Sequence, residues 1–355
     1  MRIGIDCRKI EDFGIGTYVR ELLRAMAAAA PDETFVAFGP RTIESHLPST
    51  GSIERVDVDA PHYSIRELGT IGRAANGAKL DLFHAPHYVV PLVRGPVVVT
   101  IHDLIHLQVR HANPLRLLYA RGMLRRATRR PARILTVTEA VARTIARAYP
   151  DAAPRIRAVH NGVEDRFFGA TVPSPAGRRY FLWIGNDKPH KNLSGLIAAW
   201  RKAAPSLHDC DLVLAGAPSG ELRAEPQVRL AGFVPAEELP SLLAGAVALI
   251  LPSFLEGFGL PVAEAMAAGC PVIASAIPPL QEVAGVAAVW CDPADPESIA
   301  KAMTSLAVDP RLRGELIAKG RLRADRFRWE RSAEKTIEIY REAVLEKMTE
   351  APVFK

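Results

Sequence analysis

The chain has 355 residues, of which 48% are hydrophobic and 24% are charged, fractions close to those of an average globular protein. This composition excludes a fibre, a long disordered chain and a low-complexity scaffold. At roughly 150 residues per domain, the length predicts about two domains.

The sequence shows no signal for secretion and no segment that would span a membrane. The first ten residues, MRIGIDCRKI, lack the long apolar core of a signal peptide. No later segment reaches the roughly 18 apolar residues that cross a bilayer, so we expect a cytoplasmic protein. The four cysteines have no Cys-x-x-Cys spacing, which predicts buried free thiols in place of disulfides or a zinc site. They are Cys7, Cys210, Cys270 and Cys291.

Strands and helices alternate along the first half of the chain. Short apolar runs predict buried strands at 2–6, 34–39, 81–86, 96–103 and 134–140. After the first of them, residues 14–29 predict a glycine loop, containing Gly14 and Gly16, that opens into a helix. Strands that alternate with helices predict parallel β-α-β units and a doubly wound sheet.

The pattern breaks at 171–179, where Pro, Ser, Gly and Arg predict a linker, and then restarts. Strands are predicted at 180–185, 211–216, 229–233, 247–252 and 271–275. Helices are predicted at 192–204, 238–246 and 261–269. A further amphipathic helix at 328–347 is expected to pack across one of the sheets.

The sequence therefore predicts an α/β protein with two Rossmann-like doubly wound domains. The first is predicted over 1–170 and the second over 171–335, and residues 336–355 are predicted to form a C-terminal helix that crosses back to the first domain. Ligands of open α/β sheets bind outside the carboxyl ends of the strands. Two such domains that face each other would form a central ligand cleft.

The net charge of +6 is concentrated in one segment, because residues 104–138 contain no Asp or Glu before Glu139. Its arginines alternate with Leu, Tyr and Met at helical spacing, as in a basic amphipathic helix. Three interpretations stay open: a solvated helix face, an anionic membrane surface, or nucleic acid. The arginines are Arg110, Arg116, Arg121, Arg125, Arg126, Arg129, Arg130 and Arg133. Under the second interpretation, the six from Arg116 to Arg130 are expected to face the membrane.

Two glutamates stand in an apolar segment, FLEGFGLPVAEAMAAG, at 254–269. Pro261 suits the first turn of a helix and Gly269 the position just after its end, so Glu256 lies on a loop and Glu264 about one turn into the helix. Backbone N–H groups at a helix amino terminus bind anions. An anion that also carries hydroxyl groups, such as a nucleotide-sugar, would satisfy both the donors and the two carboxylates.

This segment, E-GFGLPVA-E, resembles the Glu-x7-Glu motif of retaining glycosyltransferases of family 4. The resemblance spans nearly the whole chain and is especially close to bacterial branches that build O-antigens, capsules and exopolysaccharides, many of which use GDP-mannose. It implies the GT-B fold. The other matching segments are GIGTYVREL, the His102-Asp103 pair, VHNGVEDRFF, WIGNDKPHKNL and LAGFVPAEELPSLL.

The resemblance also implies roles for single residues. Glu264 would accept hydrogen bonds from the ribose hydroxyls, and Glu256 would accept them from the transferred sugar. Lys191 would lie against the diphosphate, and His102 would point toward the donor sugar. His102, Lys191 and Glu256 are therefore the catalytic candidates.

The remaining donor-binding candidates act mainly through their backbone. Gly257, Phe258, Gly259 and Leu260 would hold the sugar and distal phosphate, and the backbone of Val234 would read the base edge. Gly14 and Gly16 would let the backbone approach the donor phosphates or the acceptor. Many relatives have an arginine where this chain has Asn186, so Lys188 would have to supply the positive charge.

The expected function is metal-independent, retaining transfer of a hexose from a nucleotide-sugar to a lipid-linked or oligosaccharide acceptor. GDP-mannose is the favoured donor, and UDP-glucose or UDP-N-acetylglucosamine come next. No cofactor, no metal and no nucleic-acid partner is expected, and the protein is expected to be cytoplasmic or peripheral on the inner face of the cell membrane. The alternatives are a nucleotide-sugar 2-epimerase of the same architecture, which lacks Glu-x7-Glu, and a basic nucleic-acid-binding protein.

Overall fold

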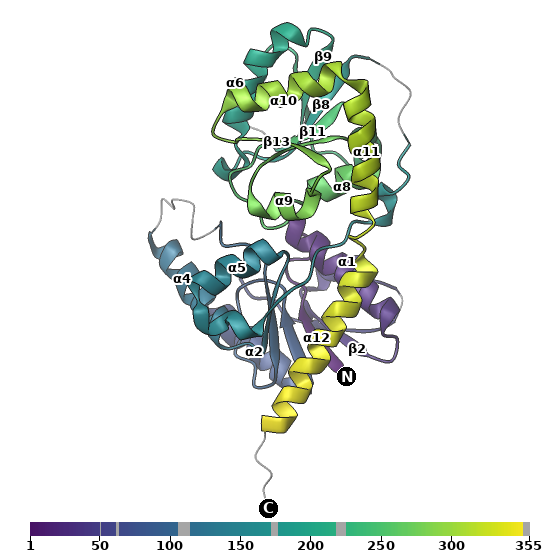
Figure 1. Cartoon of the computed structure of the whole chain (residues 1–355). Helices are drawn as coiled ribbons and strands as arrows, with labels where there is room; N and C mark the ends of the chain where they lie inside the picture. Colours follow the sequence, from purple (N-terminus) through teal and green to yellow (C-terminus); the bar gives the residue numbers. More distant parts are fainter. Residues whose placement is uncertain (50, 62–63, 106–113, 172–176, 218–224, 351–355) are drawn as a thin grey trace, which may run out of the picture. The chain divides into compact units, whose positions relative to one another are not determined.

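The computed structural model describes residues 1–49, 51–61, 64–105, 114–171, 177–217 and 225–350. The chain divides into two compact units (Figure 1). Unit 1 contains Met1–Gly162 together with the C-terminal segment that starts at Trp329, and unit 2 contains Val163–Arg328.

Unit 1 is built on a seven-stranded parallel sheet in the order β3-β2-β1-β4-β5-β6-β7. Along β1, Ile3 and Ile5 point to one face and Gly4 to the other, the period of two that a strand buried on both faces shows. The strands are β1 Arg2–Asp6, β2 Thr34–Gly39, β3 Ser52–Asp57, β4 Leu82–Ala85, β5 Val97–Ile101, β6 Arg133–Thr136 and β7 Ile156–Ala158.

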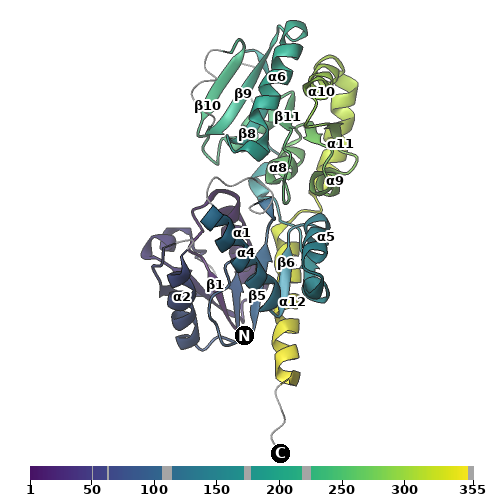
Figure 2. The same ribbon diagram turned by 90° about the vertical axis from the view of Figure 1, so that its left-hand side faces the viewer.

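Helices cover both faces of this sheet (Figure 2). Helices α1 (Phe13–Ala29) and α12 (Trp329–Glu350) share one core with Ile3, Phe35 and Leu82 of the strands. The opposite face carries α2 Ile65–Gly77, α4 Pro114–Arg129 and α5 Glu139–Ala148.

Unit 2 repeats this design with a six-stranded parallel sheet in the order β10-β9-β8-β11-β12-β13. Its strands are β8 Arg179–Asn186, β9 Cys210–Ala217, β10 Val228–Gly232, β11 Ala248–Leu251, β12 Val272–Ser275 and β13 Ala288–Cys291. Helices α6 and α10 share a core with one sheet face, and α8 packs with α7, α9 and α11. The helices are α6 Leu193–Ala203, α7 Leu239–Ala244, α8 Leu260–Ala268, α9 Pro278–Ala284, α10 Pro296–Val308 and α11 Pro310–Ala324.

Short 3-10 helices complete the connections. They are η1 Arg41–His46, η2 Pro150–Arg155, η3 Asp165–Phe167, η4 Pro189–Lys191 and η5 Ala204–Ser206. None of the helices in the described ranges is both long and apolar enough to cross a membrane.

The predicted α/β class with two Rossmann-like doubly wound domains is confirmed, and the predicted glycine loop is wrong. Gly14 and Gly16 lie in the first turn of α1, which already begins at Phe13. The N–H of Gly16 donates to the carbonyl of Asp12 at 2.8 Å, and a Cβ on Gly16 would lie 2.4 Å from the carbonyl oxygen of Ile10. Glycine is thus needed because the helix starts against the preceding turn. Strands β3, β7 and β13 and helices α9 to α11 were not predicted.

The division between the units falls at Gly162, ahead of the predicted boundary at 170/171, and again at Arg328. Helix α12 begins at Trp329, within one residue of the amphipathic helix predicted at 328–347 and ahead of the C-terminal segment predicted at 336–355, and it belongs to unit 1. Residues 172–176 of the predicted linker lie outside the described residues. The central cleft stays a prediction.

Candidate active site

Each sheet has one position where the connections that leave two neighbouring parallel strands run toward opposite edges of the sheet. In unit 2 this switch point lies between β8 and β11, since the chain moves from β8 to β9 and β10 on one side and returns to β11 on the other. Crevices at such carboxyl ends are the usual ligand sites of open α/β sheets. Asn186 and η4 follow β8, and the loop that carries Glu256 follows β11.

Lys191 and Glu256 meet at this switch point. The Lys191 Nζ donates to Glu256 Oε1 at 2.8 Å, although the residues are 65 positions apart. The Lys191 and Glu256 side chains are 18% and 8% exposed, so the pair is largely buried but still in contact with solvent. The backbone N–H of Phe254 donates to the carbonyl of His190 at 2.8 Å, which holds the two loops together. Two of the three catalytic candidates are therefore brought into direct contact.

The loop between Glu256 and α8 is fixed by its backbone and by one buried ring. Gly259 has a φ of +84° at the amino terminus of α8, a conformation that favours glycine. Phe258 is buried and its ring lies edge-on to that of Phe327, with centroids 5.4 Å apart. Leu260 is the first residue of α8, one position earlier than predicted. Gly257 to Leu260 thus form a rigid entry to the helix.

Glu264 lies one turn into α8, as predicted, and faces η3. Burial raises the pKa of Glu264 to about 7, the nearby Glu164 raises it further, and Arg166 acts in the opposite direction. Arg166 and Glu164 form an ion pair at 2.5 Å. At neutral pH this carboxyl therefore titrates, and a ligand that donates hydrogen bonds to it would favour the ionised form.

The other donor-binding candidates in unit 2 surround the same edge of the sheet. Asn186 ends β8, and its Oδ1 accepts from the N–H of Lys188 at 3.4 Å. The Lys188 side chain is exposed, and Val234 lies on the loop after β10. The N–H of Lys191 donates to the carbonyl of Lys188 at 2.9 Å, so the backbone places Lys188 next to Lys191 at this edge of the sheet.

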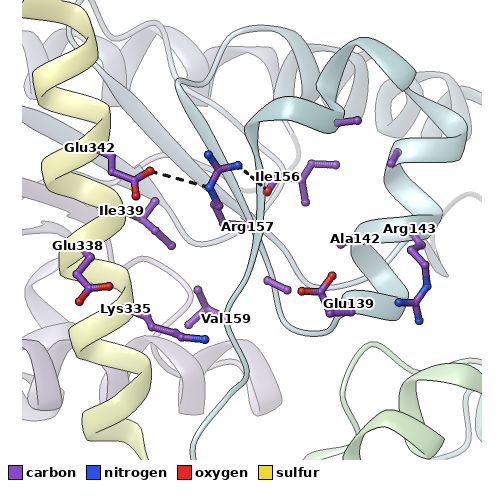
Figure 3. Close-up of a pocket in the computed structure, with 13 residues that line it drawn as sticks. Glu139, Ala142, Arg143, Ile156, Arg157, Val159, Lys335, Glu338, Ile339 and Glu342 are labelled. Carbon is purple, nitrogen blue, oxygen red and sulfur yellow. Dashed lines mark hydrogen bonds and ion pairs between the residues drawn. The ribbon is translucent and has the colours of Figure 1, made fainter.

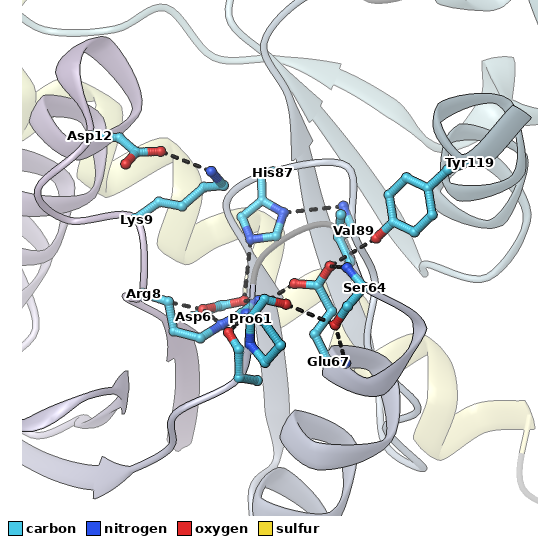
Figure 4. Close-up of polar contacts among 11 residues, drawn as sticks. Asp6, Arg8, Lys9, Asp12, Pro61, Ser64, Glu67, His87, Val89 and Tyr119 are labelled. Atoms are coloured by element: carbon cyan, nitrogen blue, oxygen red, sulfur yellow. Dashed lines mark hydrogen bonds and ion pairs between the residues drawn. The ribbon is translucent and has the colours of Figure 1, made fainter. Parts of the chain in front are cut away.

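The switch point of unit 1, between β1 and β4, holds a buried ionic network (Figure 4). The Arg8 guanidinium donates to both carboxylate oxygens of Asp6 at 2.9 and 2.8 Å, and to Glu67 Oε2 at 2.9 Å. The Tyr119 hydroxyl donates to Glu67 Oε1 at 2.8 Å, which ties α4 to α2. The carboxylates and the guanidinium are 0–2% exposed.

His87 completes this network. The N–H of Val89 donates to His87 Nδ1 at 3.2 Å, so the ring proton belongs on Nε2, which lies 3.3 Å from Asp6 Oδ2. Burial would raise the pKa of Asp6, but His87 and Arg8 outweigh it and hold that pKa well below its usual range. Asp6 is therefore ionised at every physiological pH.

His102 lies beside a second buried chain of hydrogen bonds. His102 Nε2 is 2.9 Å from the carbonyl oxygen of Pro86, and its ring lies edge-on to Tyr18 at 4.8 Å between centroids. Burial lowers the pKa of His102, so the ring is neutral near pH 7. The chain runs from Tyr340 to His84 Nδ1 at 2.6 Å, from His84 Nε2 to Thr100 at 2.8 Å and from Thr100 to Tyr18 at 2.9 Å.

The basic segment is only partly available to a partner. Arg126 donates to the carbonyls of Val90 and Pro91, and Arg130 donates to that of Val93, so the prediction that these two face a membrane is wrong. They face the protein because carbonyls of the 90–95 segment accept hydrogen bonds from both guanidinium groups. Arg121, Arg125 and Arg129 are exposed. The Arg116 side chain lies outside the described part of the structure.

An open groove of about 470 Å³ lies elsewhere on unit 1, between α5, β7 and α12 (Figure 3). It contains none of the predicted site residues. Three carboxylates and three cationic side chains line the groove, so its formal charge does not favour either an anionic or a cationic ligand. These are Glu139, Glu338, Glu342, Arg143, Arg157 and Lys335. Within the described ranges, no three His, Cys, Asp or Glu side chains are grouped so that they could hold a metal ion.

Comparison with known proteins agrees with this architecture. Sucrose-phosphate synthase from Thermosynechococcus elongatus has a similar fold, with a TM-score of 0.78 and 20% identity, and the match covers 98% of this chain and 100% of that one. Two Rossmann-like units with parallel sheets of this kind define a protein of the GT-B class.

The family follows from sequence comparison. The description "Glycosyltransferase Family 4" matches residues 14–167, and "Glycosyl transferases group 1" matches residues 167–323. The chain is 28% identical to O-antigen chain mannosyltransferase B of Escherichia coli over 92% of this chain and 96% of that protein. It is 30% identical to alpha-maltose-1-phosphate synthase of Mycolicibacterium smegmatis over 72% and 76%. The chain belongs to the group 1, family 4 glycosyltransferases.

Sequence reasoning missed two groups of residues around these sites. Asn192 follows Lys191 directly, yet only Lys191 was singled out in PHKNL. Asp6, Arg8 and Glu67 were missed because they are separated by up to 61 residues and no local motif joins them. A signal was available for Asp6 and Arg8, since two charges directly after a buried strand need partners when buried.

Proposed function

We propose that this glycosyltransferase transfers mannose from GDP-mannose, without a metal ion and with retention of the anomeric configuration. The Lys191–Glu256 contact at the unit 2 switch point is the observation that carries the proposal. The relative named an O-antigen chain mannosyltransferase supports the choice of sugar. UDP-glucose and UDP-N-acetylglucosamine are the next donors to test.

Lys191 supplies the cation that the departing diphosphate needs. As the bond between the anomeric carbon and the phosphate oxygen breaks, positive charge develops on the sugar and negative charge on the diphosphate. A preorganised cation and the amino terminus of α8 stabilise the latter. The acceptor oxygen attacks on the same face, and its proton passes to the departing phosphate oxygen.

The two glutamates position the donor. Glu256, next to Lys191, accepts hydrogen bonds from the transferred sugar, and Glu264 accepts them from the ribose hydroxyls. Neither acts as the nucleophile of a glycosidase. Trapping a covalent sugar on Glu256, detected by mass spectrometry of the intact protein, would contradict this assignment.

A donor panel tests the proposal directly. GDP, UDP, GDP-mannose, UDP-glucose and UDP-N-acetylglucosamine are compared by thermal shift, because a ligand that binds only the folded state raises its melting temperature. We expect the largest rise with GDP or GDP-mannose, and proton NMR of the product should show the donor's anomeric configuration. Inversion would contradict the mechanism, and conversion of UDP-N-acetylglucosamine without an acceptor would reveal an epimerase.

The acceptor is proposed to be a lipid-linked sugar at the inner face of the cell membrane. The exposed face of α4 supports this, since Leu118 is 68% exposed and Arg121, Arg125 and Arg129 are exposed at helical spacing from it. Co-sedimentation with vesicles that contain anionic lipid should exceed that with neutral vesicles. Salt-dependent binding to DNA with no vesicle binding would favour a nucleic-acid role for this face.

A further inference from the structure

We propose that Asn192 is a positioning residue that holds Lys191 against the diphosphate site. This inference rests on the proposed function for its kinetic test, but its geometry stands alone. Asn192 is 4% exposed and occupies the left-handed region, with a φ of +56°, between η4 and α6. Its side chain makes no cap bond to α6, so the buried amide is available for other contacts.

The Asn192 amide joins two loops at the carboxyl edge of the unit 2 sheet. Its Nδ2 donates to the carbonyl of Pro252 at 3.0 Å and to that of Pro293 at 2.7 Å. Pro252 directly follows β11 and leads to Glu256, whereas Pro293 follows β13. An amide nitrogen has two protons, and both are used here.

The backbone of Asn192 fixes the turn that carries Lys191. Its N–H donates to the carbonyl of Pro189 at 3.2 Å, and its carbonyl accepts from the N–H of Leu196 in α6 at 3.1 Å. Lys191 is thus anchored from the next residue, on the side that faces the Glu256 loop. Misplacing a reacting group by about 1 Å can cost about 100-fold in rate. Loss of this anchoring should therefore lower the turnover rate.

Gln227 provides a matched control in the same unit. It also has a positive φ, +58°, and its Nε2 donates to the carbonyls of Leu207, His208 and Cys210. These lie at the amino end of β9, the opposite edge of the sheet from Lys191. Asn192→Gly and Gln227→Gly each keep the positive φ and remove an amide that bridges carbonyls, so general loss of stability should be similar in both.

The first measurement needs no substrate. Purified full-length variants are treated with an acylating reagent, and the acylation rate of Lys191 is followed by mass spectrometry of peptides. We expect Asn192→Gly to raise that rate several-fold and Gln227→Gly to leave it unchanged. Asn192→Ser, which retains one hydroxyl donor, should be intermediate and serves if the glycine variant does not fold. An unchanged rate at Lys191 in a folded Asn192 variant would overturn the proposal.

The second measurement is a double-mutant cycle on transfer kinetics. We expect Asn192→Gly to lower kcat by about 10- to 100-fold while KM for the acceptor is unchanged. In the Lys191→Met background the same change should have no further effect, since Asn192 acts through Lys191. Full additivity would overturn the proposal. If no nucleotide-sugar is transferred at all, the proposed function fails, and the acylation result still decides the role of Asn192.

Discussion

The two switch points contain the same pairing of cation and carboxylate in different surroundings. In unit 1 the Arg8 guanidinium lies between Asp6 and Glu67, with side chains 0–2% exposed. In unit 2 the Lys191 ammonium pairs with Glu256 at 18% and 8% exposure. Charges as deeply buried as those of unit 1 must be fully paired. The pair in unit 2 keeps access to water, and under the proposed function its lysine would exchange the carboxylate partner for a phosphate.

The choice of cation follows the same division. The planar guanidinium of Arg8 makes several bonds in fixed directions and locks β1 to α2. The ammonium of Lys191 is a point charge on a flexible stem and tolerates a change of partner. The contacts at the unit 1 switch point are those of a structural network, whereas the proposed function places the ligand at the switch point of unit 2.

The largest effect is expected from Arg8→Ala. It leaves two buried carboxylates without their cation, so the free energy of unfolding should fall by about 3–5 kcal/mol, measured by urea denaturation. Arg2→Ala is the control, because Arg2 pairs with Glu54 at the surface and its loss should cost about 1 kcal/mol or less. Equal losses for the two variants would remove the contrast between buried and accessible pairs.

Lys191→Met should produce the opposite pattern. Transfer should fall by about 100-fold or more, since a cation at the developing charge is lost, while the melting temperature changes little. Lys202→Met is the control, because Lys202 forms an exposed pair with Glu297 in the same unit. A large loss of stability with normal turnover would mean that both switch points are structural.

Glu264 predicts a pH dependence of donor binding. Its pKa of about 7 means that the carboxyl is mostly protonated below that pH. If ribose hydroxyls bind the ionised form, affinity should fall by up to about tenfold per pH unit below pH 7. Isothermal titration between pH 5.5 and 8.5 measures this, and Glu264→Gln should flatten the profile.

The same pKa makes an independent prediction about stability. A carboxyl whose pKa is raised in the folded state stabilises the fold most below its unfolded pKa, and this contribution is lost as pH rises through about 7. Relative to Glu264→Gln, the native protein should therefore become less stable from pH 5 to 8 as its donor affinity rises. Parallel changes in both quantities would contradict the assignment.

The smallest effect separates the arginines of α4. Arg126→Ala removes bonds to the carbonyls of Val90 and Pro91 and should cost about 1–2 kcal/mol of unfolding free energy. Arg125→Ala, on the exposed side, should cost less than about 0.5 kcal/mol and should weaken binding to anionic vesicles instead. If Arg126→Ala weakened vesicle binding and Arg125→Ala lowered the unfolding free energy, the exposed face of α4 would have been identified wrongly.

The strands and the Glu-x7-Glu segment were predictable because each is a local pattern. Apolar runs bounded by Gly and Pro indicated β8 and β11, and Pro261 with Gly269 bounded α8 to within one residue. The Lys191–Glu256 contact follows only from strand order, which places β11 beside β8. No residue spacing encodes that order.

The same limit applies to the arginines of α4. Helical spacing correctly indicated a helix, but it did not indicate that Arg126 and Arg130 meet carbonyls from a loop about 35 residues earlier. The raised pKa of Glu264 comes first from burial and then from Glu164, which directly precedes η3, a segment that packs on α8 although it lies about 100 residues earlier. Such neighbours appear only when the fold is known.

Helix α12 has a consequence for how the chain matures during synthesis. Trp329, Ile337 and Tyr340 complete the core that α1 shares with the first sheet, and they are made after all of unit 2. Unit 2 is one continuous segment and can fold as soon as it leaves the ribosome. Unit 1 must wait with an apolar face of its sheet uncovered until α12 has been synthesised. A chain that stops before Trp329 would therefore contain a finished second unit and an aggregation-prone first one.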